Sequence, residues 1–165
     1  MSVDVNDRAE VESDLWDQIK DARVGMLGAM SGPPRHFQPM TPYADRDEGR
    51  IWFFTRRDTE LFKYLGSGRE AMFIIQNSKY QACIAGRLTE RTDRAKVEEH
   101  WNPVVASWYP EGKDDPQLAM VSFECKDAEI WLNQVSPVRF AWEVAKANAT
   151  DSVPDMGDRA SLSFN

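Results

Sequence analysis

Hydrophobic and polar positions along this chain form one segment with a helical repeat and several short apolar runs. Over residues 8 to 22, apolar residues recur at steps of four and three, which predicts a helix with one apolar stripe. The later apolar runs are separated by glycine, proline and charged residues, as hairpin connections would be. These runs are "RVGMLGAM", "RHFQPMTPYA", "RIWFFT", "EAMFII", "YQACIAGRL" and "QLAMVSFECKDAEIWLN". The pattern therefore predicts about six strands, and we expect the last to bend near Lys126 and Asp127.

Two further helices are indicated between the strands. Residues 58 to 66 predict a short helix, with Asp58 as a candidate N-cap and Gly66 as a candidate stop. Asp93 opens another helix, which Pro103 is expected to end or kink. The tail from Asn148 is polar, so we expect it to be held only in part. Strands in meander order with helices at the edges favour a mainly β fold, a small barrel in one domain over residues 1–165.

Composition narrows the class of protein. An apolar share of 42% and a charged share of 28% are typical of a globular chain. The net charge of −7 argues against nucleic acid and anionic membranes as partners, so any phosphate-bearing ligand needs a local cluster of donors. The start of the sequence lacks a basic segment followed by an apolar run, and no apolar span reaches about 20 residues, so we expect a cytoplasmic protein. Cys83 and Cys125 lie in apolar runs and are expected to be reduced.

Most catalytic chemistries lack support in the sequence. His36 and His100 are the only histidines and have no regular ligand spacing, which argues against a zinc or iron site made by protein ligands alone. No serine lies in a strand–turn–helix elbow, and neither cysteine has a local histidine partner. The segment "LGSGREA" follows a helix and lacks the third glycine of a dinucleotide fingerprint. No catalytic residue can be assigned.

Two adjacent arginines form the clearest candidate site. Arg56 and Arg57 lie between the buried run "IWFF" and the short helix that follows. Free N–H groups and the dipole at a helix start favour an anion, and an arginine would strengthen such a site. Because successive side chains at a strand end leave on opposite faces, only Arg56 is expected to face a cleft. The alternative is a solvated pair beside a capping Asp58, whose own charge disfavours an anion. These residues alone leave both interpretations open.

The environment of Trp131 is also left open by the sequence. On an alternating strand it shares a face with Glu129 and Asn133, the more polar side. A large aromatic side chain there needs a partner surface, either another subunit or a flat ligand.

The order of several segments adds information that single motifs lack. "RVGMLGAM", "QPMTPY", "IWFFTRRD", "YQACIAGRLTE" and the stretch from "HWNPVVASWYPEGKDDP" to Trp131 follow one another. In this order the chain resembles, over residues 10 to 160, the general stress protein branch of the pyridoxamine 5'-phosphate oxidase-like, FMN-binding split-barrel proteins. The resemblance implies a six-stranded split β-barrel and a homodimer with one flavin in each of two clefts between subunits. The implied cofactor is FMN, with FAD or weak binding as alternatives.

The resemblance also implies which residues bind the cofactor. They are Gln38, Pro39, Met40, Phe54, Thr55, Arg56, Thr59, Tyr80 and Trp131. The first three occupy the segment whose backbone runs along the isoalloxazine ring. The next three end the strand that meets the flavin and its phosphate, and the hydroxyl of Thr59 is expected near that phosphate. Tyr80 begins the strand after a hairpin, and Trp131 approaches the ring from the other subunit.

Two positions depart from the family pattern. Gln38 stands where arginine is usual, and Leu61 stands where a phosphate-contacting lysine is usual. Charge-assisted contacts contribute about 1.5–3 kcal/mol each, so we expect weak FMN binding that Leu61→Lys would strengthen. The predicted function is flavin-nucleotide binding by a general stress-type protein. Two roles stay open: a flavin-dependent oxidoreductase of unknown substrate, or a non-enzymatic stress-associated dimer that binds flavin weakly or has lost it.

Overall fold

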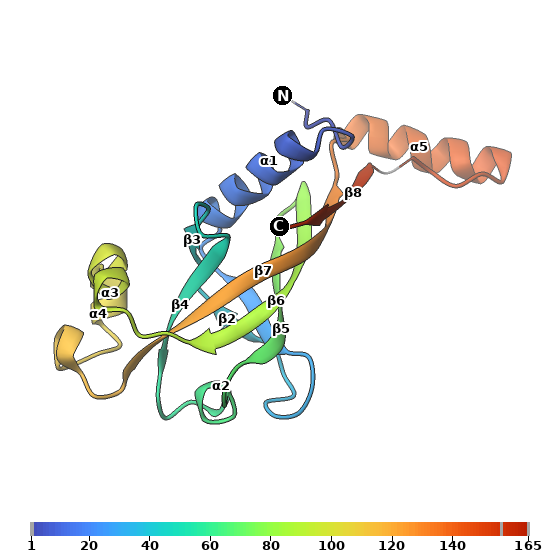
Figure 1. Ribbon diagram of the computed structural model, residues 1–165. Helices are drawn as coiled ribbons and strands as arrows, with labels where there is room; N and C mark the ends of the chain where they lie inside the picture. The colour runs from blue at the N-terminus through green and yellow to red at the C-terminus, as the bar shows by residue number, and fades with distance from the viewer. Residues whose placement is uncertain (1, 156, 165) are drawn as a thin grey trace.

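One curled antiparallel sheet forms the centre of the molecule (Figure 1). The computed structural model describes residues 2–155 and 157–164. Its strands are β1 (Gly25–Ala29), β2 (Gln38–Met40), β3 (Tyr43–Asp45), β4 (Arg50–Arg56), β5 (Arg69–Gln76), β6 (Tyr80–Glu90), β7 (Leu118–Leu132) and β8 (Asp158–Ser163). They are arranged in the order β2-β1-β5-β6-β7-β4-β3, and β8 pairs with β7 off this path.

The two edges of the sheet are consecutive in the sequence. Only Thr41 and Pro42 separate β2 from β3, so the strand ends are at most about 11 Å apart by chain length alone. The sheet must therefore curl until its edges approach, which makes it a split barrel. The expected mainly β split-barrel fold is confirmed. The described residues form eight strands where about six were expected, because "RHFQPMTPYA" divides at Thr41-Pro42 and β8 was not predicted.

Strand β7 connects the two parts of the sheet. It pairs with β4 over its first half, with β8 over its second half, and with β6 along both. Ala85 pairs with Asp127 but Gly86 pairs with Cys125, so Lys126 is an extra residue. This β-bulge is the bend expected near Lys126. A Cβ at Gly86 would lie 2.3 Å from a backbone oxygen of β7, so the close approach requires glycine.

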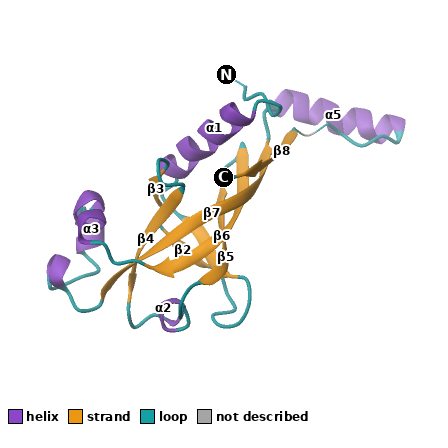
Figure 2. Cartoon of the chain, viewed as in Figure 1, coloured by secondary structure: helices purple, strands orange, loops and turns teal. Residues whose placement is uncertain are grey.

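The helices lie outside the sheet (Figure 2). They are α1 (Arg8–Asp21), α2 (Glu60–Lys63), α3 (Arg94–His100), α4 (Pro103–Ala106) and α5 (Pro137–Thr150). The apolar stripe of α1 is buried against the sheet, and Asp7 caps its start. Asp93 caps α3 as expected, whereas Thr59, not Asp58, caps α2. Pro103 begins α4 after α3 has ended, which fits its fixed φ at a first helical position.

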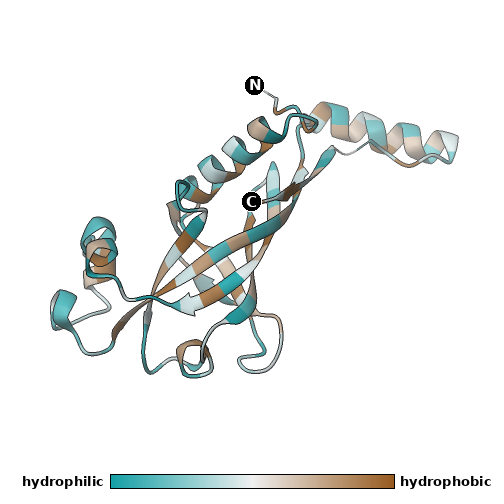
Figure 3. Cartoon of the chain, in the orientation of Figure 1, coloured by the Kyte–Doolittle hydropathy of each residue, from teal (hydrophilic) through white to brown (hydrophobic). Residues whose placement is uncertain are grey.

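The buried residues form two clusters. The larger fills the inside of the barrel, where β6 alternates strictly between buried and half-buried residues, and Figure 3 shows the hydropathy alternating along the strands. The smaller lies between the outer face of β4 and α3 and α4, and includes Trp52, Val97, Val105 and Tyr109. Strand β4 is therefore covered on both faces, which explains the unbroken run of large apolar residues in it.

The C-terminal part is more ordered than the sequence suggests. Residues 158–163 form β8, and Arg8 donates a hydrogen bond of 2.5 Å to the carbonyl of Ser163. Helix α5 includes the start of the expected tail, while residues 156 and 165 lie outside the described part. In Figure 1, α5 extends away from the sheet, and Val138, Phe140 and Trp142 on it are exposed. No helix of the described residues is long and apolar enough to cross a membrane.

Candidate functional site

A cleft of about 290 Å³ lies where the two sheet edges meet the end of β4 and helix α4. Its lining comes from three separate segments of the chain. The lining residues are Gln38, Pro39, Met40, Thr41, Tyr43, Phe54, Thr55, Arg56, Thr59, Val104, Val105, Trp108 and Tyr109. Seven of the residues named from the sequence are brought together here: Gln38, Pro39, Met40, Phe54, Thr55, Arg56 and Thr59.

One wall of the cleft is aromatic and aliphatic. The rings of Phe54 and Tyr43 meet edge-to-face with centroids 5.5 Å apart. At the mouth, Val104 is 71% exposed and Trp108 is 66% exposed, which is unusual for side chains of this kind. An apolar slot with a few polar groups at one end suits a flat, amphipathic ring system.

Hydroxyl groups occupy the floor of the cleft. The hydroxyl oxygens of Thr55 and Thr59 are 3.3 Å apart, and Thr59 donates to the carbonyl of Arg56 at 2.8 Å. The Thr59 oxygen also accepts from the backbone of Phe62, so this hydroxyl holds the start of α2. The Tyr109 hydroxyl donates to the Thr55 carbonyl at 2.5 Å. Burial raises the pKa of Tyr109 to about 12, which keeps the phenol protonated and a donor at neutral pH.

Arg56 is the one cation among the described residues that line the cleft. Its Nε donates to Oδ1 of Asp58 at 3.2 Å, and its Nη2 donates to Oδ2 at 3.0 Å. Nη1 donates to the carbonyl of Trp108 at 3.2 Å. The paired hydrogen bonds raise the pKa of Arg56 and lower the pKa of Asp58. The cation is thus held at the rim of the cleft by a neighbouring carboxylate and by the chain after α4.

The side chain of Arg57 points away from the cleft, on the other side of the chain from Arg56. It donates from Nη1 to Oε1 of Glu90 at 3.1 Å, and its guanidinium carbon lies 5.2 Å from the centroid of the Phe62 ring. Arg57 does not line the cleft. The two adjacent arginines therefore diverge at the strand end, with Arg56 on the cleft side, as strand alternation predicts.

Tyr80 and Trp131 lie away from this cleft. Tyr80 begins β6 as expected, is 3% exposed, and its hydroxyl has no hydrogen-bond partner among the described residues. Trp131 is on the outer face of β7 and is 42% exposed, with the guanidinium carbon of Arg159 5.7 Å from its ring centroid. Arg159 is held by Glu129 at 2.8 Å. Within one chain, neither aromatic reaches the residues around Arg56.

Leu61 corrects an expectation from the sequence. Its side chain is 1% exposed and belongs to the main core, and it does not line the cleft. Leu65, one turn later, is also buried, so α2 turns its apolar face inward. A lysine at position 61 would begin in the core and not at the anion site, so Leu61 does not account for a missing charge in the cleft.

Helix α4 supplies cleft residues to which sequence analysis gave no role. The side-chain oxygen of Asn102 accepts from the backbone N–H groups of Val104 and Val105 at 2.9 and 3.0 Å, and Pro103 follows it. An Asn-Pro pair of this kind signals a helix start, so "NPVVA" could have been identified as one. The Asn102 amide also donates to the Tyr43 hydroxyl at 3.1 Å, which joins two walls of the cleft.

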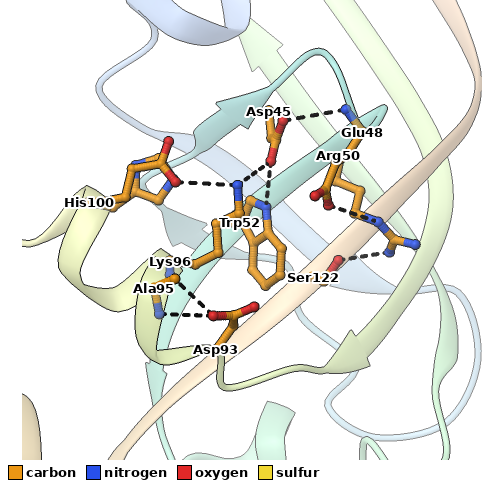
Figure 4. Close-up of polar contacts among 10 residues, drawn as sticks. Asp45, Glu48, Arg50, Trp52, Asp93, Ala95, Lys96, His100 and Ser122 are labelled. Atoms are coloured by element: carbon orange, nitrogen blue, oxygen red, sulfur yellow. Dashed lines mark hydrogen bonds and ion pairs between the residues drawn. The ribbon is translucent and has the colours of Figure 1, made fainter.

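A charged network joins α3 to β3 and β4 (Figure 4). Lys96 Nζ lies 2.6 Å from Oδ2 of Asp45, which also accepts from the indole of Trp52 at 3.4 Å. Burial pushes the pKa of Asp45 up, but the hydrogen bond from Lys96 and further donors bring it below its ordinary value. The ring of His100 lies 5.0 Å from that of Tyr43, and burial lowers the pKa of His100. Through the contact between His100 and Tyr43, helix α3 also touches a side chain that lines the cleft.

Comparison with known proteins identifies relatives of the chain. The family model described as "Pyridoxamine 5'-phosphate oxidase like" matches residues 10–155. A structure described as a general stress protein 26 from Jannaschia sp. CCS1 is 34% identical, with a TM-score of 0.77, over 94% of this chain and 99% of that chain. A general stress FMN/FAD binding protein from Xanthomonas citri is 39% identical, with a TM-score of 0.71, over 78% of this chain and 92% of that chain. No curated protein matches the chain.

Proposed function

The chain belongs to the pyridoxamine 5'-phosphate oxidase-like family. We therefore propose that it binds a flavin nucleotide, with FMN as the first candidate, in the cleft around Arg56. The observation that carries this proposal is the convergence of β2, the end of β4, the start of α2 and helix α4 on one apolar cleft with a single arginine at its rim. The relative from Xanthomonas citri, described as an FMN/FAD binding protein, supports a flavin as the ligand.

The residues present fit such a ligand. Pro39, Met40 and Phe54 offer apolar surface to the isoalloxazine ring, while Gln38 and the backbone of β2 offer polar groups to its edge. Arg56 offers the charge-assisted donors that a phosphate needs. A bound flavin would supply the redox chemistry, and the chain would supply binding, orientation and exclusion of water.

We also propose that the site is completed by a second copy of the chain. A cleft of about 290 Å³ is at the lower end of the range of small-molecule sites, roughly 300–1,000 Å³. The exposed Val104 and Trp108 at its mouth leave apolar surface for a partner to cover. Trp131 and the outward face of α5 are further exposed aromatic surfaces on the same molecule. A homodimer would bury these surfaces and could bring the partner subunit's Trp131 to the flavin.

A second candidate role is flavin binding without turnover. The ionisable side chains among the described lining residues are Tyr43, Arg56 and Tyr109, and the phenol of Tyr109 has a pKa of about 12. None of these is a carboxylate, histidine or thiol, the groups that usually exchange protons near neutral pH. An oxidoreductase would thus rely on the flavin for its chemistry. Consumption of a nicotinamide reductant by the FMN-loaded protein would favour the oxidoreductase over the binding protein.

The direct experiment is a titration. The purified protein is mixed with FMN and with riboflavin, and binding is followed by flavin fluorescence and by the visible absorption spectrum. We expect saturable binding of FMN with one flavin per chain. Absence of binding for both flavins at millimolar concentration would refute the proposed function.

A further inference from the structure

We propose that Asp58 competes with a ligand phosphate for Arg56 and thereby sets how strongly the cleft prefers phosphorylated flavins. This inference rests on the proposed function and adds a specificity-determining residue to it. Asp58 does not line the cleft and is half-exposed, so it acts on the ligand only through its charge and through Arg56.

The hydrogen bonds of Arg56 define the competition. Three of the five guanidinium N–H groups are engaged, two by the carboxylate of Asp58 and one by the carbonyl of Trp108. The edge formed by Nε and Nη2 is fully occupied by Asp58. A phosphate can use the two N–H groups that remain, or it must displace Asp58 from the bidentate edge. In either case it approaches an ion pair whose net charge is near zero.

Electrostatics sets the direction and the size of the effect. Arg56 is the one cation lining the described part of the cleft, so no second lysine or arginine at its wall offsets Asp58. A carboxylate about 6 Å from a phosphate dianion in water weakens binding by about tenfold at low ionic strength, and by less at physiological salt. Removing the Asp58 charge should therefore tighten the binding of FMN and leave riboflavin, which lacks the phosphate, unaffected.

Local structure makes Asp58 a suitable residue to change. The N-cap of α2 is Thr59, whose hydroxyl accepts from the backbone of Phe62. The side-chain hydrogen bonds of Asp58 within the described residues go to Arg56. Asp58→Asn keeps the shape and one acceptor for Arg56 while it removes the charge, so it should leave the helix start in place.

The neighbouring arginine, Arg57, provides a matched control through its own carboxylate partner. Glu90 pairs with Arg57 at 3.1 Å, outside the cleft. Glu90→Gln changes the net charge of the protein by the same amount as Asp58→Asn, and it also frees an arginine at the same strand end. It should leave FMN affinity within about twofold of the parent, because Arg57 does not face the ligand.

The experiment measures Kd for FMN and riboflavin in the parent, Asp58→Asn, Asp58→Ser and Glu90→Gln, at low and at high salt. We expect both Asp58 variants to bind FMN about three- to tenfold more tightly at low salt, with the gain reduced at high salt and riboflavin unchanged. The inference is overturned if neither Asp58 variant binds FMN more tightly, if riboflavin gains equally, or if Glu90→Gln gives the same gain. Failure of every variant to bind either flavin would overturn the proposed function as well, whereas flavin binding without a gain overturns the inference alone.

Discussion

The side-chain amide of Asn102 donates a 3.1 Å hydrogen bond to the hydroxyl of Tyr43, and its oxygen caps helix α4. Two walls of the cleft that are 59 residues apart in the sequence are therefore held by one side chain. Asn102→Ala should lower the free energy of unfolding by about 1–2 kcal/mol through loss of the cap and should weaken FMN binding. Urea denaturation and FMN titration measure the two effects.

Tyr43→Phe is the matched control for this prediction, because it removes the joining hydrogen bond and leaves the cap intact. We expect it to reduce stability by less than Asn102→Ala does, about 0.5–1.5 kcal/mol. Equal stability and equal FMN affinity for Asn102→Ala and the parent would show that the two walls do not depend on Asn102.

Leu61→Lys should destabilise the protein and should not tighten FMN binding. The Leu61 side chain is 1% exposed in the main core, and lysine there would bury a charge or leave the core unfilled. The expected loss is at least about 2 kcal/mol in urea denaturation. Leu61→Met, which conserves volume, should cost less than about 1.5 kcal/mol. A stable lysine variant with tighter FMN binding would instead place position 61 at the phosphate, as the sequence alone had suggested.

Acid should destabilise the fold in part through His100. Burial lowers the pKa of His100 in the folded protein, so below the ordinary histidine pKa of about 6.5 the unfolded chain binds the proton more readily. Its contribution is therefore present above about pH 6.5 and is lost as the pH falls below that value. His100→Gln should flatten the decline of unfolding free energy between about pH 7 and 5. His36, which is exposed, is the control, and an identical effect of His36→Gln would contradict the assignment.

The proposed homodimer has a simple mass signature. Light scattering at micromolar concentration should give about twice the chain mass of 18.9 kDa. A double change of Phe140 and Trp142 to serine removes two exposed apolar side chains of α5 and should shift the mass towards the monomer. A parent protein that is monomeric at these concentrations would remove the second wall proposed for the cleft.

The parts of the fold that were predictable are those with a local signal. The stripe of α1, the continuous run of β4 and the alternation of β6 appear in the sequence because each is set by burial against one core. Strand β8 has only Ala160 and Leu162 facing inward, so its alternation of apolar and polar residues is too short to stand out in a polar segment. Helix α5 has apolar residues at helical spacing, but it buries only Ala147 among its described side chains, and sequence analysis did not identify it.

Some parts of the candidate site could also be predicted from the sequence, and others could not. The segments of β2 and β4 were identified through the order of motifs, and they line one cleft. The inward direction of Leu61 had a local signal, because Leu65 lies one turn later on the same face, but the resemblance placed position 61 at the phosphate. The cleft wall from α4 depends on packing against Tyr43 and β4, which brings together residues about 50 positions apart.

The central claim is that Arg56, and not its neighbour Arg57, binds the phosphate of a bound flavin. The test is the Kd for FMN and for riboflavin in Arg56→Ala, Arg57→Ala and the parent. Because Arg56 is partly exposed and shared with Asp58, we expect Arg56→Ala to weaken FMN binding by roughly tenfold. Arg57→Ala should change FMN binding by less than about twofold, and neither change should affect riboflavin. Equal losses of FMN affinity for the two variants, or a loss in Arg56→Ala that persists with riboflavin, would contradict the account.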